Sequence, residues 1–173
     1  MKRRELLTTM VATGIGVPAF AAQGHGHKEL SGPLSTATVS FGYWPEGSNR
    51  FTTPRAPQAP NGHALLPYDV KVKAGGTVNF IVAGFHLITV YAPGKTVDDV
   101  NVASLAPGSV PPGLIDDAEG RVYFGIDPRT MPQDRVEVVQ FANSGRHLVI
   151  CAVLPHFRSN VHPPMHGWVT VLP

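Results

Sequence analysis

Apolar and polar residues alternate with a period of two along several short segments of this chain. In 70–73, valines alternate with lysines, and in 78–82 apolar residues again occupy every second position, after the turn signal Gly75-Gly76. Alternation of this kind is typical of strands with one buried face. The expected strands, including shorter apolar runs, are 36–44, 70–73, 78–82, 87–91, 121–126, 134–141, 147–154 and 166–173. Seven or eight strands joined by turns predict an all-β, antiparallel β-sandwich.

Two segments lack this alternation and are expected to be loops. The segment 46–67 is rich in proline and polar residues, and we expect a long surface loop there. The segment 92–120 contains four prolines, four glycines and five acidic residues. It predicts a loop excursion with a short helical turn in 97–105, in which the acidic pairs Asp98-Asp99 and Asp116-Asp117 lie in solvated turns.

The first 21 residues have the pattern of an export signal. Residues 2–4 are basic, a mildly apolar stretch follows, and Ala19-Phe20-Ala21 has the form of a cleavage site. The paired arginines resemble a twin-arginine signal, although Lys2 stands where Ser or Thr is usual. The apolar stretch is too short to span a membrane. We therefore expect a periplasmic or otherwise exported protein with a signal peptide at 1–21, a flexible lead at 22–35 and a single domain at 36–173.

Charge argues against nucleic acid and anionic membranes as partners. The chain has 14 basic and 12 acidic side chains, of which three basic and one acidic lie in the expected signal. The remaining chain therefore carries 11 of each and has no net formal charge. Nucleic-acid and membrane-surface binding both depend on an excess of basic residues, which is missing here.

The most informative stretch for chemistry surrounds the only cysteine, Cys151. A single cysteine cannot form an internal disulfide, so in an oxidising compartment it pairs between chains, stays buried, or binds a metal. The run "HLVICAVL" is apolar enough for a central strand, with Cys151 near its end and its sulfur directed inward. Taken alone, this pattern is typical of a buried structural thiol.

Neighbouring residues favour a metal site instead. Pro155 ends the strand, and His156 follows on a loop that can bring its imidazole back to the sulfur of Cys151. Met165 comes later on the same loop, and His86 interrupts an apolar segment upstream. Thiolate, imidazole and thioether ligands together suit copper.

These segments resemble a known family. "VNFIVAGFHLITVY", "VVQFANSGRHLVICAVLPHF" and "MHGWVTVLP" are similar to the first-histidine, cysteine and methionine strands of the cupredoxins, the type 1 blue copper proteins of the azurin and plastocyanin kind. The resemblance covers 68–173 and implies a Greek-key β-sandwich that binds one copper ion per chain. It implies His86, Cys151 and His156 as trigonal ligands and Met165 as the weak axial ligand.

One departure leaves the axial ligand open. Eight residues separate His156 from Met165, where these families usually have three or four, and the insertion adds His162 as an alternative axial ligand. The other histidines are expected to lie outside the site. His147 is four residues from Cys151, about 13 Å along a strand. His63 lies in the expected surface loop without a visible partner, and His166 begins the last strand facing away from Met165.

Three functions are consistent with these residues. The first is a monomeric electron carrier that exchanges single electrons with redox partner proteins through His156, which we expect near the surface among Pro155, Phe157, Pro163 and Pro164. The second is copper storage or delivery, favoured by the extra histidines, including His25 and His27 in the lead. The third is a small enzyme like the red-copper relatives, which needs an open coordination position. We expect an electron carrier rather than an enzyme.

Overall fold

A computed structural model describes residues 34–43, 62–108, 111–130, 132–158 and 164–173 of the chain. The expected signal peptide, most of the flexible lead, and His25, His27, His162 and Pro163 lie outside these ranges. The described strands are β1 (Leu34–Tyr43), β2 (Gly62–Leu66), β3 (Asp69–Val82), β4 (Ile88–Tyr91), β5 (Arg121–Phe124), β6 (Arg135–Phe141), β7 (Gly145–Cys151) and β8 (His166–Leu172). A one-turn helix, α1 (Leu154–Phe157), lies between β7 and β8. The prediction of an all-β fold with seven or eight strands is confirmed.

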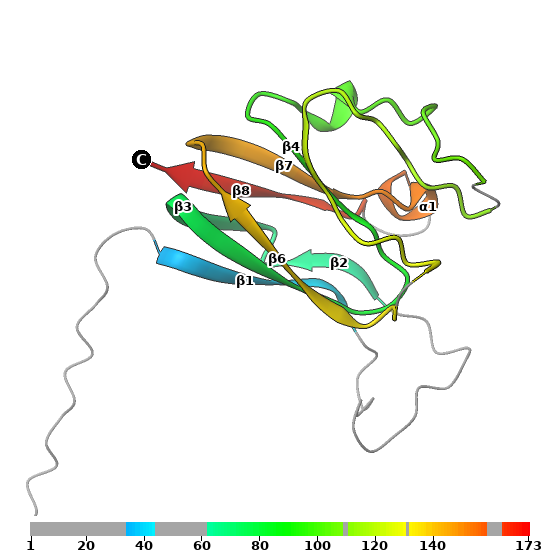
Figure 1. Ribbon diagram of the computed structural model, residues 1–173, viewed down its shortest axis with the longest axis horizontal. Helices are drawn as coiled ribbons and strands as arrows, with labels where there is room; N and C mark the ends of the chain where they lie inside the picture. Colours follow the sequence, from blue (N-terminus) through cyan, green and yellow to red (C-terminus); the bar gives the residue numbers. More distant parts are fainter. Residues whose placement is uncertain (1–33, 44–61, 109–110, 131, 159–163) are drawn as a thin grey trace, which may run out of the picture. The chain divides into compact units, whose positions relative to one another are not determined.

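The strands form two layers that share β3 (Figure 1). The first part of β3 pairs with β8, and the order continues through β7 and β4 to β5. The second part pairs with β1 on one side and β6 on the other, and β2 lies at the outer edge of β1. Because one strand contributes to both layers, residues far apart in the sequence meet across the same core.

The prediction of a turn at Gly75-Gly76 is wrong, because β3 continues through both glycines. Gly75 has φ +79°, which glycine adopts without strain. At Gly76 an added Cβ would lie 2.7 Å from the Lys73 carbonyl oxygen and 2.8 Å from that of Ser35. The two glycines therefore let the strand bend and change partners. The expected antiparallel pairing holds for five of the seven described strand pairs, whereas β3 pairs in parallel with both β1 and β8.

The core lies between the two layers and is formed by the alternating positions of the strands. Val72, Val78, Phe80 and Val82 of β3 are fully buried. In β7 every residue from His147 to Cys151 is buried, because β4 and β8 flank it on both sides. Each such apolar side chain contributes about 1.5–3 kcal/mol by burial. The prediction of a central strand with Cys151 near its end is confirmed, although the strand ends at Cys151 and not at residue 154.

The excursion at 92–120 is tied to the core rather than loosely solvated. It contains one 3₁₀ turn, Val97–Asp99, as the sequence predicts. Asp117 is only 5% exposed and accepts hydrogen bonds from Lys95 at 2.7 Å and from the backbone of Asn101 and Glu119. Burial alone would raise the pKa of Asp117, but these hydrogen bonds hold it below its usual value. The expectation of a solvated turn at Asp116-Asp117 is therefore wrong for Asp117.

None of the helices in the described part of the chain has the length and apolar composition needed to cross a bilayer.

Candidate metal centre

His86, Cys151 and His156 meet at one end of the sandwich, where β7 ends and β8 begins (Figure 1). β-sheet pairing sets this arrangement. Cys151 pairs with Ile88 of β4, which brings His86, two residues earlier, next to the sulfur. Met165 directly precedes β8, and its carbonyl accepts a hydrogen bond from the Cys151 amide at 2.9 Å. The Met165 amide donates to the His156 carbonyl at 2.9 Å.

The three donor atoms form a compact triangle. The Cys151 Sγ lies 3.5 Å from His86 Nδ1 and 3.6 Å from His156 Nδ1, and the two nitrogens are 3.1 Å apart. A point equidistant from the three atoms lies about 2.0 Å from each. Metal sites in proteins have bonds of about 2.0–2.1 Å to imidazole nitrogen and about 2.3 Å to thiolate sulfur. The triangle therefore has the size that a bound transition-metal ion requires.

His156 is held by α1 rather than by the predicted loop. The chain turns into this helix at Leu154-Pro155, and Pro155 occupies an early helical position, where its missing N–H costs no hydrogen bond. Phe157 is fully buried and anchors the turn. Our expectation that Phe157 contributes to a surface rim is therefore wrong.

The excursion at 92–120 braces this helix. Gly113 accepts a hydrogen bond from the Leu154 amide at 2.9 Å, and Ile115 donates to the Ala152 carbonyl at 2.7 Å. Leu114 forms a β-bridge with Val153 between these two contacts. The excursion thus fixes the backbone that joins Cys151 to His156.

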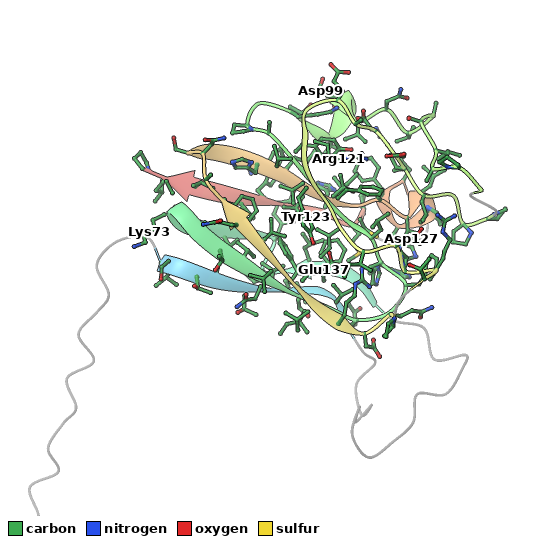
Figure 2. The ribbon with its side chains drawn as sticks, viewed as in Figure 1. Lys73, Asp99, Arg121, Tyr123, Asp127 and Glu137 are labelled. Atoms are coloured by element: carbon green, nitrogen blue, oxygen red, sulfur yellow. The ribbon has the colours of Figure 1, made fainter. Side chains whose placement is uncertain are left out.

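A buried ionic network positions the backbone of His86. Arg135 of β6 donates to the His86 carbonyl at 2.8 Å, and Glu137 holds Arg135 with a 2.6 Å ion pair. The Arg135 and Glu137 side chains are only 8% and 1% exposed. Tyr123 of β5 donates to Glu137 at 2.7 Å, and Figure 2 labels both residues near each other in the interior of the sandwich. The network therefore links both layers to the His86 segment.

Burial keeps Cys151 and His86 neutral when no metal is bound. Desolvation raises the pKa of Cys151 to about 12, so its side chain is a thiol at ordinary pH. Desolvation, followed by repulsion from His156 and His63, lowers the pKa of His86 to about 2. The pocket therefore disfavours isolated charges, and His86 offers a metal ion a nitrogen donor without releasing a proton.

Sequence reasoning missed a fourth residue at this end of the sandwich, His63. It lies on β2, within the segment that we expected to be a loop, and both the loop at 62–66 and the isolation of His63 are wrong. The His63 ring lies 4.0 Å from the His156 ring, centroid to centroid, and 5.4 Å from the His86 ring. The pairing of β2 with β1 brings His63 close to the rings of His86 and His156. The only local signal was the apolar pair that follows, since Leu65 shares a strand face with His63.

The two remaining described histidines lie apart from this triangle. His147 is buried, with its ring nitrogens 3.0 Å from the Tyr91 carbonyl and 3.1 Å from the Asn143 carbonyl. His166 hydrogen-bonds to the Tyr68 hydroxyl at 3.0 Å. His162, the alternative axial ligand, lies outside the described residues.

Comparison with known proteins identifies the fold. No family model matches the sequence, and no curated protein matches it. Among solved structures, a reduced auracyanin from the photosynthetic bacterium Roseiflexus castenholzii is 18% identical with a TM-score of 0.51, covering 82% of this chain and 100% of its own. Auracyanin B (17%, TM-score 0.48, coverage 82% and 91%) and a plastocyanin from Dryopteris crassirhizoma (19%, TM-score 0.43, coverage 78% and 98%) are also similar. The first of these decides the fold. This chain has the cupredoxin fold.

At 18% identity the likeness to auracyanin extends to the cupredoxin fold only. The case for a metal site therefore rests on this chain's own geometry. Three of the four residues that the cupredoxin resemblance implies, His86, Cys151 and His156, lie within hydrogen-bonding distance of one another. Met165 is fully buried, and its backbone forms hydrogen bonds with the backbone of Cys151 and of His156.

Replacing Gly42 by alanine is expected to displace the His86 ring and weaken metal binding by about tenfold or more. Gly42 lies at an irregularity of β1, and an added Cβ would be 2.5 Å from His86 Nε2. Its φ of +80° would also be strained for alanine, at a cost of about 1–3 kcal/mol. Zinc(II) titration and denaturant unfolding measure the two effects.

Gly94→Ala is the matched control for this variant. Gly94 has φ +97° but an added Cβ there meets nothing within 4 Å, so the backbone strain is retained without the contact to His86. We expect Gly94→Ala to lower stability and leave metal affinity unchanged. Equal metal affinities in the two variants would show that Gly42 does not position His86.

Proposed function

We propose that the chain binds one copper ion through His86, Cys151 and His156 and exchanges single electrons with redox partner proteins. The observation that carries the proposal is the triangle of one sulfur and two nitrogens with sides of 3.5, 3.6 and 3.1 Å. Two imidazoles and a thiolate in a trigonal set are the donors of blue-copper electron-transfer sites. Bound copper supplies a one-electron couple between Cu(I) and Cu(II).

The protein frame suits electron transfer because it fixes the donor atoms. Cys151 lies at the end of a central strand, α1 holds His156, and the ion pair of Arg135 and Glu137 braces His86. A site whose ligands do not move when the charge of the ion changes needs little reorganisation during electron transfer. The same restraint also keeps water away from Cys151, which is completely buried.

His156 is the candidate route for electrons. It is partly exposed, whereas His86, Cys151 and Met165 are fully buried. Pro155 is exposed and Leu154 is half-buried, and the exposed Leu105 approaches the same glycine, Gly113, as Leu154 does. A small apolar rim of this kind suits brief docking, in which fast release matters more than affinity. With no net formal charge on residues 22–173, docking depends little on salt.

Export is part of the proposal. The basic start, apolar stretch and cleavage pattern of residues 1–21 support it. A monomer of this kind would meet its redox partners outside the cytoplasm.

One equivalent of Cu(II) is expected to give an intense visible absorption band and narrow copper hyperfine splitting in the EPR spectrum. Both features arise from covalency between copper and the Cys151 thiolate. Cys151→Ser is expected to abolish them, because serine supplies no sulfur ligand. A pale wild-type spectrum with ordinary hyperfine splitting would contradict the proposed site.

Met165→Leu is expected to retain copper and raise its reduction potential. Met165 is the candidate axial ligand, and loss of a thioether removes an electron donor that favours Cu(II). Protein film voltammetry measures the potential, and Leu is close to Met in volume, so the fully buried position stays filled. An unchanged spectrum and potential would transfer the axial assignment to another residue.

Copper storage or delivery is the second candidate, and the position of His63 beside His86 and His156 favours it. Reversible cycling between Cu(I) and Cu(II) without loss of the ion distinguishes electron transfer from this alternative.

A further inference from the structure

His63, His86 and His156 form a second cluster of possible metal donors. One ligand nitrogen from each ring lies within 4.8 Å of the other two. The His63 and His156 rings are 4.0 Å apart and inclined by 32°, and the His63 and His86 rings are 5.4 Å apart at 76°. The cluster shares His86 and His156 with the thiolate triangle, but it contains His63 in place of Cys151.

The fold brings His63 to this place from β2, the strand at the edge of the layer that contains β1. Among the described strands β2 pairs with β1 alone, and Phe41 of β1 lies opposite Leu65. His63 and Leu65 share one face of β2, and Leu65 is buried in the core, so both side chains point inward. At the irregularity of β1, Gly42 leaves room for the His86 ring beneath this strand.

We propose that these three imidazoles are a second coordination site for a divalent cation of borderline softness, such as zinc(II) or copper(II). Imidazole nitrogens are the preferred neutral ligands of both ions. Bonds of about 2.0–2.1 Å in a tetrahedral site require nitrogens about 3.4 Å apart. The nitrogens now lie within 4.8 Å of one another, so a shift of at most about 1.4 Å reaches that spacing. An imidazole on an edge strand achieves it by rotating its side chain.

The three histidines of the cluster differ in their exposure to solvent. His63 and His156 are partly exposed, whereas His86 is fully buried. An ion that arrives from solvent meets His63 and His156 before it reaches Cys151, which is completely buried. Transfer from the three-imidazole set to the thiolate set then exchanges one ligand, His63 for Cys151, and releases the thiol proton to solvent. This loading route rests on the proposed function, whereas the three-imidazole site itself does not.

The test removes the thiolate first. The full chain with Cys151→Ser is titrated with zinc(II), and it is compared with the same chain that also carries His63→Gln. Both carry His25→Gln and His27→Gln, so that the lead does not bind metal. We expect one zinc ion per Cys151→Ser chain and an affinity at least about tenfold lower after His63→Gln, since even residues that only orient a ligand change metal affinity by that factor.

His63→Phe is the second variant, because it keeps a ring against His156 and removes both nitrogens. Loss of affinity in both His63 variants, with an unchanged circular dichroism spectrum, supports the site. His166→Gln serves as the matched control, because His166 bonds to Tyr68 and lies outside the cluster. Zinc affinity within twofold of the Cys151→Ser chain in either folded His63 variant would overturn the proposal, as would failure of the Cys151→Ser chain to bind zinc.

The two proposals fail in different ways. The thiolate site is tested by the visible band of the wild-type chain with copper, which does not require His63. The three-imidazole site is tested in chains without the thiol. For the loading route, stopped-flow mixing of copper(II) with the wild-type chain is expected to give a visible band that forms at least about tenfold faster than in His63→Gln. Equal rates would overturn the route.

Discussion

Glu137→Gln is expected to destabilise the folded protein by about 3–5 kcal/mol, because it leaves the Arg135 charge buried without its partner. The Glu137 carboxylate accepts hydrogen bonds from Arg135, from Tyr123 at 2.7 Å and from the Ile126 amide at 3.2 Å. The Glu137 side chain is only 1% exposed, so water does not reach this position to solvate the unpaired charge of Arg135. Glutamine keeps the shape but offers one carbonyl oxygen to three donors.

Equilibrium unfolding in urea measures this loss. Glu119→Gln makes the same chemical change on an exposed side chain and is expected to alter stability by less than about 0.5 kcal/mol. A Glu137→Gln chain as stable as Glu119→Gln would mean that the ion pair contributes nothing to the fold.

The reduction potential of the proposed copper site provides a second readout of the same variant. Arg135 donates to the His86 carbonyl, and its guanidinium is one of the groups that lower the pKa of His86. Without Glu137, the full positive charge of Arg135 acts on the site and disfavours the higher charge of Cu(II). The reduction potential of Glu137→Gln is therefore expected to rise, and that of Glu119→Gln to stay unchanged.

The sequence predicted the strand that carries Glu137 but could not give the face that it buries. Residues of β6 alternate as expected, yet Val136 and Val138 are 58% and 59% exposed while Glu137 is 3% exposed. An alternating pattern identifies a strand equally well whichever face turns inward. Here the buried carboxylate is compensated by Arg135, two residues earlier on β6, and by Tyr123 of β5. Whether this pair of charges turns inward depends on how β5 and β6 pack, which the local sequence does not give.

In the candidate site, the residues that are close in the sequence were predicted, and the residue that strand pairing brings in was missed. The spacing of Cys151, His156 and Met165 is local, so the chain alone predicts that these residues lie near one another. His63 was missed because its contact with His156 depends on the pairing of β1 with β2, a strand of five residues after a proline-rich segment. The turn expected at Gly75-Gly76 was wrong for a related reason, since glycine marks a bend within a strand as well as a hairpin.

Zinc binding is expected to release one more proton from the wild-type chain than from Cys151→Ser. Burial raises the pKa of Cys151 to about 12, so the side chain of the metal-free protein is a neutral thiol at ordinary pH. A metal ion binds the thiolate, and the thiol proton therefore leaves for the solvent when the ion binds. Zinc(II) is a suitable probe because it does not oxidise the thiol.

The sign of the pH dependence follows from this proton. Because binding at Cys151 releases a proton, affinity rises with pH, by about tenfold per pH unit for each proton released. His86 adds nothing to the slope between about pH 6 and pH 9. Burial, with repulsion from His156 and His63, lowers its pKa to about 2, and its ring is already neutral there. The wild-type slope is therefore expected to exceed that of Cys151→Ser by one.

Calorimetric titration in two buffers with different ionisation enthalpies counts the protons directly. The difference between the wild-type chain and Cys151→Ser isolates Cys151 when both chains also carry His63→Gln, because the histidines that can bind the ion are then the same in both. Equal proton counts would mean that the sulfur does not bind the ion, and Cys151 would then be a core residue. A difference of one proton together with a steeper wild-type slope would identify the thiolate as a ligand independently of any copper spectrum.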